Sequence, residues 1–254
     1  MIHCAQRWVR MAIRGWWLGL AMVMLASCGG PETANPDTRP SISPEDFALV
    51  PCGPARADRP CVLAVAGGKR ILFGAPAGVS ATLADADLRQ LDAVMLFSLH
   101  AVDIEGLDEV RNASWHAGRS EPLLVVGPEG TLGVVEALNA AFEQADALRV
   151  VEEGMPPGGY DAAVLVGREV VRGASAPVFD TGDVRVFSSP MQMAIEYVGK
   201  AAETQAAIVI YSCMLLRSEQ NGVPVVSSPV RTLGCGTDDL SWPLNETVFI
   251  VKSE

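Results

Sequence analysis

Histidine is scarce in this chain. The 254 residues include three histidines, and one of them, His3, lies in an N-terminal segment that we expect to be removed. A catalytic zinc ion commonly takes three protein ligands, with histidine prominent among them. The remaining two, His100 and His116, are therefore too few for an ordinary histidine-rich metal centre.

Basic side chains are also few. Lysine and arginine together number 19, against 30 aspartates and glutamates, which gives a formal net charge of −11. Residues 1–27 contain three arginines and no acid, so their removal leaves 16 basic against 30 acidic side chains. Nucleic-acid binding depends on clustered lysine and arginine. This charge balance argues against a nucleic-acid partner.

Long apolar runs are missing except near the N-terminus. The run WWLGLAMVMLA, residues 16–26, is only about half as long as the roughly 20 residues that a membrane-spanning helix needs. Three arginines precede it, and the segment Leu25-Ala26-Ser27-Cys28 follows. This order resembles a bacterial lipoprotein signal, in which the cysteine is lipidated and becomes the new N-terminus. We therefore expect lipidation of Cys28, which would attach the chain to a membrane.

The same signal bears on location and on domain boundaries. Gly29 stands where an aspartate would retain a bacterial lipoprotein at the inner membrane, so the resemblance implies the periplasmic face of the outer membrane. We expect a lipoprotein signal peptide at 1–27, a flexible tether at 28–45 and a folded domain at 46–254. The tether is rich in proline, serine, threonine and acids, which bury too little apolar surface to fold.

Four cysteines of the folded part, Cys52, Cys61, Cys213 and Cys235, allow three pairings. Cys52 and Cys61 flank the short loop GPARADRP, so local closure favours a bridge between them. A Cys213–Cys235 bridge would then follow. The alternative is four reduced, buried thiols, and an oxidising compartment favours the disulfides.

The apolar pattern predicts a mixed α/β domain. Short apolar runs indicate strands, and apolar residues at helical spacing indicate helices. The expected strands span 61–66, 70–73, 92–98, 121–130, 148–153, 162–166, 183–190, 193–198, 206–216, 223–228 and 246–251. The expected helices span 80–91, 103–119 and 131–145, with Ser80 and Thr131 as N-caps of the first and third.

Four stretches between residues 62 and 150 follow one another in a characteristic order. They read ILFGAPAGVS, LDAVMLFSLHAVDIEGL, SWHAGRSEPLLVVGPEG and TLGVVEALNAAF. In wording and order they resemble the metallo-β-lactamase fold, in its ribonuclease Z and arylsulfatase-like branch. The resemblance implies an α/β fold, the αββα sandwich of the metallo-β-lactamase type.

The chemistry of that family is metal-assisted hydrolysis. A His-x-His-x-Asp-His turn, two further histidines and a bridging aspartate hold one or two zinc ions, which activate water. At the matching positions this chain has mostly other residues, which makes them relics of a metal site: Ser98, His100, Val102, Asp103 and Cys213.

Other ligand positions have also changed. Gly74 replaces the aspartate that usually ends the strand before the turn, and the next expected histidine falls among Met191, Gln192 and Met193. His116 lies where the family places no ligand. A residual single-metal site from His100, Asp103 and Cys213 remains an alternative, and it would lack a clear general base.

Two functional classes follow from the resemblance. The loss of most zinc ligands favours a membrane-anchored, non-catalytic binding or accessory protein without a cofactor, whose ligand is an unknown protein or small molecule. The alternative is a divergent metallo-hydrolase that uses zinc on a periplasmic ester or phosphodiester. In the first case we expect apolar and soft side chains, such as Val102 and Met193, to pack the former cleft.

Overall fold

The computed structural model describes residues 39–53, 59–170, 176–189, 192–199, 205–212, 230–236 and 239–253. All of them belong to one compact unit, Ala34–Glu254. Cys28, Met191, Cys213 and the strand expected at 223–228 lie outside the described residues. The lipidation site and the tether at 28–45 stay predictions. Within the described end of the tether, the Arg39 guanidinium contacts Asp87 at 3.0 Å.

The first sheet has seven strands in the order β13-β1-β2-β3-β4-β5-β6. Neighbours from β13 to β3 are antiparallel, and β3, β4, β5 and β6 are parallel. The two inner parallel strands, β4 and β5, are mostly buried apolar runs, because both faces of the sheet are covered there. The strands are β1 (Phe47–Pro51), β2 (Val62–Ala66), β3 (Lys69–Phe73), β4 (Leu91–Met95), β5 (Leu123–Gly127), β6 (Leu165–Glu169) and β13 (Val248–Val251).

The second sheet has six strands in the order β12-β11-β10-β9-β8-β7. Strands β7 to β10 run antiparallel, whereas β10, β11 and β12 run parallel. The strands are β7 (Phe179–Asp180), β8 (Val184–Ser189), β9 (Gln192–Tyr197), β10 (Ala206–Tyr211), β11 (Val230–Gly234) and β12 (Leu240–Ser241).

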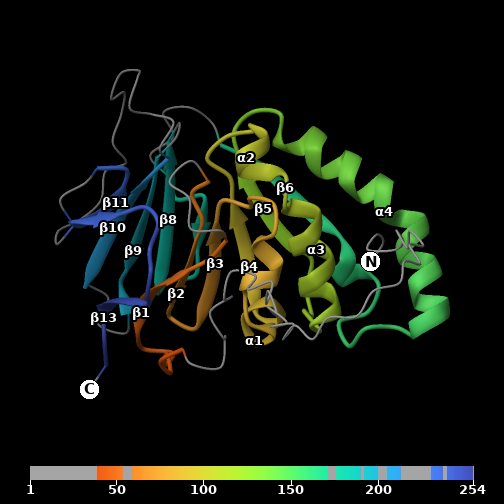
Figure 1. Ribbon diagram of the computed structural model, residues 1–254, viewed down its shortest axis with the longest axis horizontal. Coiled ribbons are helices and arrows are strands. Elements are labelled where there is room, and N and C mark those ends of the chain that lie inside the picture. The colour runs from red at the N-terminus through yellow and green to blue at the C-terminus, as the bar shows by residue number, and fades with distance from the viewer. Residues whose placement is uncertain are drawn as a thin grey trace, which may run out of the picture. The chain divides into compact units, whose positions relative to one another are not determined.

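The sheets pack face to face, and helices cover the other face of the first sheet (Figure 1). The helices are α1 (Asp85–Arg89), α2 (Ala101–Ile104), α3 (Leu107–His116) and α4 (Thr131–Glu153), with short 3-10 helices η2 (Val79–Thr82) and η3 (Asp161–Ala163). Phe73, Met95 and Ile208 belong to the apolar core that includes residues of both sheets. Leu72, Val94 and Leu107 belong to the core between the first sheet and the helices. The predicted α/β sandwich is confirmed.

Most predicted elements that fall on described residues are confirmed within a few residues, but one is wrong. Residues 148–153 were expected to form a strand because Leu148, Val150 and Val151 favour strands. They are the last turns of α4, which runs on to Glu153. No glycine or proline lies between Ala145 and Gly154, so nothing local ends the helix at Ala145.

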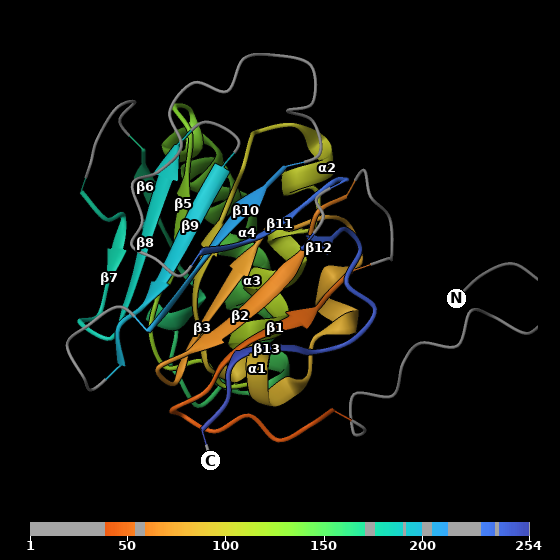
Figure 2. The same ribbon diagram turned by 90° about the vertical axis from the view of Figure 1, so that its left-hand side faces the viewer.

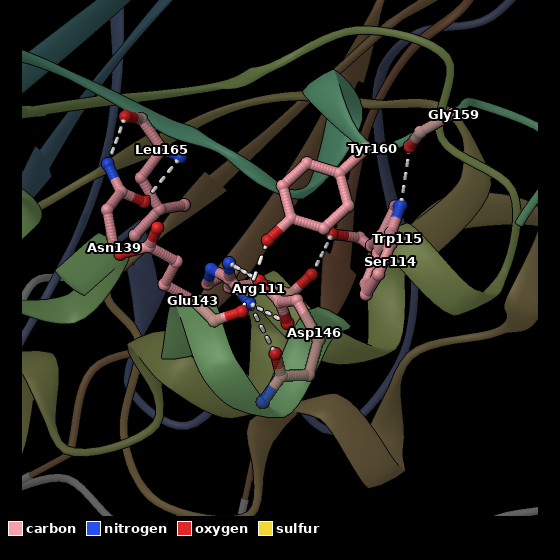
Figure 3. Close-up of polar contacts among 10 residues, drawn as sticks. Arg111, Ser114, Trp115, Asn139, Glu143, Asp146, Gly159, Tyr160 and Leu165 are labelled. Carbon is pink, nitrogen blue, oxygen red and sulfur yellow. Dashed lines mark hydrogen bonds and ion pairs between the residues drawn. The ribbon is translucent and has the colours of Figure 1, made fainter. Parts of the chain in front are cut away.

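Contacts far from its start hold α4 in place (Figure 3). The Asn139 side-chain amide donates to the Leu165 carbonyl and accepts from the Leu165 N–H, both at 2.9 Å. Further along, the Asp146 carboxylate binds the Arg111 guanidinium of α3 through both oxygens. Trp115 Nε1 donates to the Gly159 carbonyl at 2.8 Å, which fixes the loop after the helix. Tertiary contacts of this kind override local strand propensity.

The expected helix caps differ from the observed ones. Gly130, not Thr131, is the N-cap residue of α4, and it has a positive φ of 97°. The free N–H groups of Gly130 and Leu132 donate to the Glu169 carboxylate at 2.8 and 3.2 Å. An anionic side chain from β6 therefore caps this helix and complements its dipole. Ser80 lies inside η2 and directs its hydroxyl to Glu109.

The expected disulfide between Cys52 and Cys61 is present. It closes the loop just before β2. Cys235 is also disulfide-bonded, while Cys213, its predicted partner, lies outside the described residues.

Candidate functional site

Residues 98–103, which the resemblance matches to a metal-binding turn, follow β4 at the carboxyl end of the parallel strands. Because β3 to β6 run parallel, the loops after them meet at one edge of the first sheet. This is the edge where ligands of open α/β sheets usually bind. Helix α2 lies here, near the upper end of the unit in both views (Figures 1 and 2). The residues 98–103 that form the turn are therefore placed where a site is expected.

The turn closes on itself through hydrogen bonds between Ser98, His100 and Asp103. The Ser98 hydroxyl donates to Oδ2 of Asp103. It accepts from the His100 backbone N–H at 3.1 Å, and the Asp103 N–H donates to the His100 carbonyl at 2.9 Å. Asp103 is 0% exposed, and its Oδ1 atom is buried without a hydrogen-bond partner. The structure thus brings together two of the predicted positions, Ser98 and Asp103.

The turn is also fastened to the loop that follows β3. The Ala75 N–H donates to the Asp103 carbonyl at 2.9 Å, and the Gly106 N–H donates to the Ala75 carbonyl at 2.8 Å. Gly106 has no room for a side chain, because an added Cβ would lie 2.2 Å from the Pro76 carbonyl oxygen. This close approach holds α2 against the end of β3.

Gly74 occupies the position where the family usually has an aspartate. Its φ is +77°, a conformation that favours glycine. A Cβ added there would lie 2.2 Å from the Pro60 carbonyl oxygen. Backbone next to the Cys52–Cys61 disulfide therefore fills the space that an aspartate side chain at 74 would need.

The other predicted positions do not converge on Asp103. His100 is exposed and Val102 is half-buried, whereas Asp103 is fully buried. The Val102 side chain is a hydrocarbon and can neither bind an ion nor accept a proton. His116 lies at the opposite end of α3 from the turn, beside Trp115. Asp103 is thus the one carboxylate that the described turn buries.

Met193 faces the core between the two sheets. It pairs with Ser188 of β8 and Ile210 of β10, and it is 1% exposed in the same apolar cluster as Phe97 and Met95. Neighbouring residues of a strand point to opposite faces, so Gln192 points away from that core. At the described positions where the family places its downstream histidine, this chain packs a thioether against hydrocarbon.

Burial controls the ionisation of Asp103. Removal from water raises the pKa of its carboxyl group above the usual range, and the Ser98 hydrogen bond and the charge of His100 offset only part of that effect. The protonated form of Asp103 is therefore more favoured than that of an exposed aspartate.

The described residues do not fit the zinc ions that the fold family implies. Within the described ranges, no three histidine, cysteine, aspartate or glutamate side chains form a group that could hold a metal ion. A catalytic zinc commonly needs three protein ligands and an open fourth position. Asp103 gives one oxygen to Ser98 and keeps the other buried. We therefore derive no catalytic step through a metal.

The sequence indicated which positions had changed, but it could not show the Ser98–Asp103 bond or the Pro60 backbone beside Gly74. Both are contacts between residues that a pattern treats separately. The only local signal for the Ser98–Asp103 bond is the presence of a serine five residues before an aspartate, across one turn.

Comparisons with known proteins found similar solved structures but no family. No protein-family model matches the chain, and no curated protein matches it. The short form of human tRNase Z is similar in structure, with a TM-score of 0.45, 15% identity, and coverage of 66% of this chain and 69% of that one. The Bacillus subtilis metallo-β-lactamase fold protein YhfI has a TM-score of 0.43 and 16% identity, with coverage of 66% of this chain and 63% of that one. Zn²⁺-bound PqqB from Methylobacterium extorquens has a TM-score of 0.40 and 13% identity, with coverage of 65% of this chain and 62% of that one.

The chain thus spans about two thirds of the length of these proteins. At these levels of identity the similarity concerns the fold alone. The protein has an α/β sandwich of two mixed sheets, with helices over the first of them.

Proposed function

We propose that this chain is a lipid-anchored bacterial lipoprotein whose metallo-β-lactamase-like domain is a non-catalytic binding or accessory module. The lipid on Cys28 would hold it at the periplasmic face of the outer membrane, and its ligand would be a protein or a small molecule rather than a nucleic acid. No helix among the described residues is long and apolar enough to cross a membrane.

One observation carries the non-catalytic part of the proposal. The turn that holds metal in the family is closed here by the Ser98–Asp103 hydrogen bond, with Val102 in place of an acid and His100 turned to solvent. Metal coordination needs several donors aimed at one point. In the described turn the donors point to different surroundings, and their hydrogen bonds hold the turn together.

Two experiments test the proposal separately. For the anchor, the full chain and its Cys28→Ser variant are produced in a bacterial host with labelled palmitate, and the membranes are collected. We expect label and membrane attachment only in the parent chain. Equal label in both chains would disprove lipidation at Cys28.

For catalysis, the full chain is incubated with zinc or manganese and assayed on bis(4-nitrophenyl) phosphate and 4-nitrophenyl acetate. We expect the same background rate for the parent chain, His100→Ala and Asp103→Asn. A rate that depends on added metal and disappears in both variants would contradict a non-catalytic domain.

The second candidate function is a divergent metallo-hydrolase that acts on a periplasmic ester or phosphodiester. The buried, unpartnered Oδ1 of Asp103 supports it, because an unsatisfied buried oxygen is where an absent ion can belong. Metal content distinguishes the two candidates. About one equivalent of zinc or manganese per chain, lost in His100→Ala, would favour the hydrolase.

A further inference from the structure

The outward face of α4 has a composition that is unusual for a surface helix. The helix has 23 residues, and Val135, Asn139 and Asp146 on one side of it meet the rest of the domain. At 3.6 residues per turn, the opposite side forms a line that we call the outward stripe. All its residues are exposed: Gly133, Ala137, Ala140, Ala141, Gln144, Leu148 and Val151.

The outward stripe contains no charged residue. Leu148 is 57% exposed and Val151 is 83% exposed, and Met155, just beyond the helix, is 52% exposed. The solvent face of a surface helix normally carries charged and polar residues. Contiguous exposed apolar residues usually mark a contact surface. Figure 1 shows α4 on the outer side of the helical layer, where a partner could reach it.

The shape of the stripe favours a helix as the contacting element. Its middle consists of Ala137, Ala140 and Ala141, which project little from the helix. Small side chains allow a second helix to approach closely along the axis, since the distance between packed helices depends on the side chains at the contact. Leu148 and Val151 then supply aliphatic contacts at one end.

The flanks of the stripe define the charge of the partner. Glu136 and Glu143 are seven residues apart, hence on one side, and Glu152 lies on the other. All three are exposed, and the nearby Arg149 is paired with Glu153 at 2.9 Å. Lysines and arginines would complement these flanks. A second copy of this chain would bring the same acidic flanks, and an anionic lipid surface would also be repelled.

We propose that the outward stripe of α4 is the docking surface for an amphipathic helix of a partner protein, with an aliphatic seam and lysine or arginine flanks. The stripe lies on a different element from the turn at 98–103. The inference therefore goes beyond the proposed function, and either can fail without the other.

Synthetic peptides provide the probes, with the full chain in mild detergent and detergent alone as the blank. The first peptide is a leucine and lysine helix with its leucines along one face. The second has the same composition in an order that gives no apolar face, and the third replaces the lysines by glutamates. We expect calorimetry to detect binding of the first peptide only.

The decisive variant is Val151→Glu. It adds an acid and removes apolar contact, so binding through charge alone would strengthen, whereas packing on the stripe would weaken by about tenfold, the value of one buried aliphatic side chain. Val230→Glu, at a residue of β11 that is 43% exposed, is the matched control and should change nothing. Glu143→Lys should weaken the lysine peptide and improve the glutamate peptide.

Three outcomes would overturn the proposal. One is equal binding of the ordered and disordered lysine peptides. Another is binding that is unchanged or stronger in Val151→Glu. The third is a wild-type chain that dimerises, or binds neutral phosphatidylcholine vesicles, in a way that Val151→Glu abolishes, because the occupant would then be a second copy or a lipid surface.

Discussion

Asp103 and Asp146 are both buried aspartates, exposed by 0% and 4%, but their surroundings differ. Asp146 of α4 receives two hydrogen bonds from the Arg111 guanidinium of α3. Asp103 has a serine hydroxyl on one oxygen and no partner on the other. A buried charge is normally paired, so the first aspartate has the cation that a buried carboxylate needs, whereas one oxygen of the second has no partner.

The difference separates two regions of the domain. The α3–α4 region forms a permanent structural contact, in which Arg111 also lies 5.1 Å from the centre of the Phe142 ring. The turn after β4 keeps an acid in an apolar place without a counter-ion. An unsatisfied buried oxygen of this kind requires an explanation of its own, and we propose that it is left from a turn whose metal ligands have mostly been replaced.

The largest effect is expected in the framework. Arg111→Leu leaves Asp146 buried without a cation, and it should lower the free energy of unfolding by about 3–5 kcal/mol. The double variant Arg111→Leu with Asp146→Leu should recover much of that loss, because neither charge is then left alone. Urea unfolding of the parent chain, Arg111→Leu, Asp146→Leu and the double variant measures the coupling energy between the two side chains. Additive losses would show that the two side chains do not form a pair.

A smaller effect is expected from placing an acid at position 74, directly after β3. Gly74→Asp should destabilise the chain by about 2–3 kcal/mol. The new side chain would clash with the Pro60 carbonyl, and the aspartate backbone would have to keep a positive φ. Gly78→Asp is the control, since Gly78 also has a positive φ of 82° but nothing within 4 Å of an added Cβ. If both variants unfold at the same urea concentration, the Pro60 backbone does not block position 74.

The smallest effect concerns the ionisation of Asp103. Its folded-state pKa is raised by burial, so folding favours the protonated form. Stability should therefore fall as pH rises from the unfolded-state value, about 3.9, through the folded pKa. Asp103→Asn cannot titrate, so its free energy of unfolding should rise relative to that of the parent as the pH increases from about 4 to about 7. If Asp103→Asn instead loses stability relative to the parent over this pH range, a cation must stabilise the charged Asp103 more than burial destabilises it.

The sequence was sufficient for the middle of the first sheet, β2 to β5, but it did not predict β1 or β11. Buried apolar runs such as AVML and LLVV place β4 and β5 directly, because a strand covered on both faces needs little else. It failed at residues 148–153, where the strand preference of Val150 and Val151 is overruled by the anchoring of Asp146. Short edge strands such as β7 and β12, two residues each, carry too weak a pattern to be recognised.

The site divides in the same way. The shortage of histidine and the presence of Val102 could be read from the sequence, because they depend on residue identity alone. The Glu169 cap of α4 and the Pro60 oxygen beside Gly74 could not, since each joins residues more than ten positions apart.

The central claim is that the domain folds and persists without a resident zinc ion. The most direct measurement is the zinc and manganese content of the purified full chain, together with its thermal unfolding midpoint in chelator and in added zinc. The account predicts well below one equivalent of either metal and the same midpoint in both solutions. One equivalent of metal per chain, with a midpoint that drops in chelator, would contradict it.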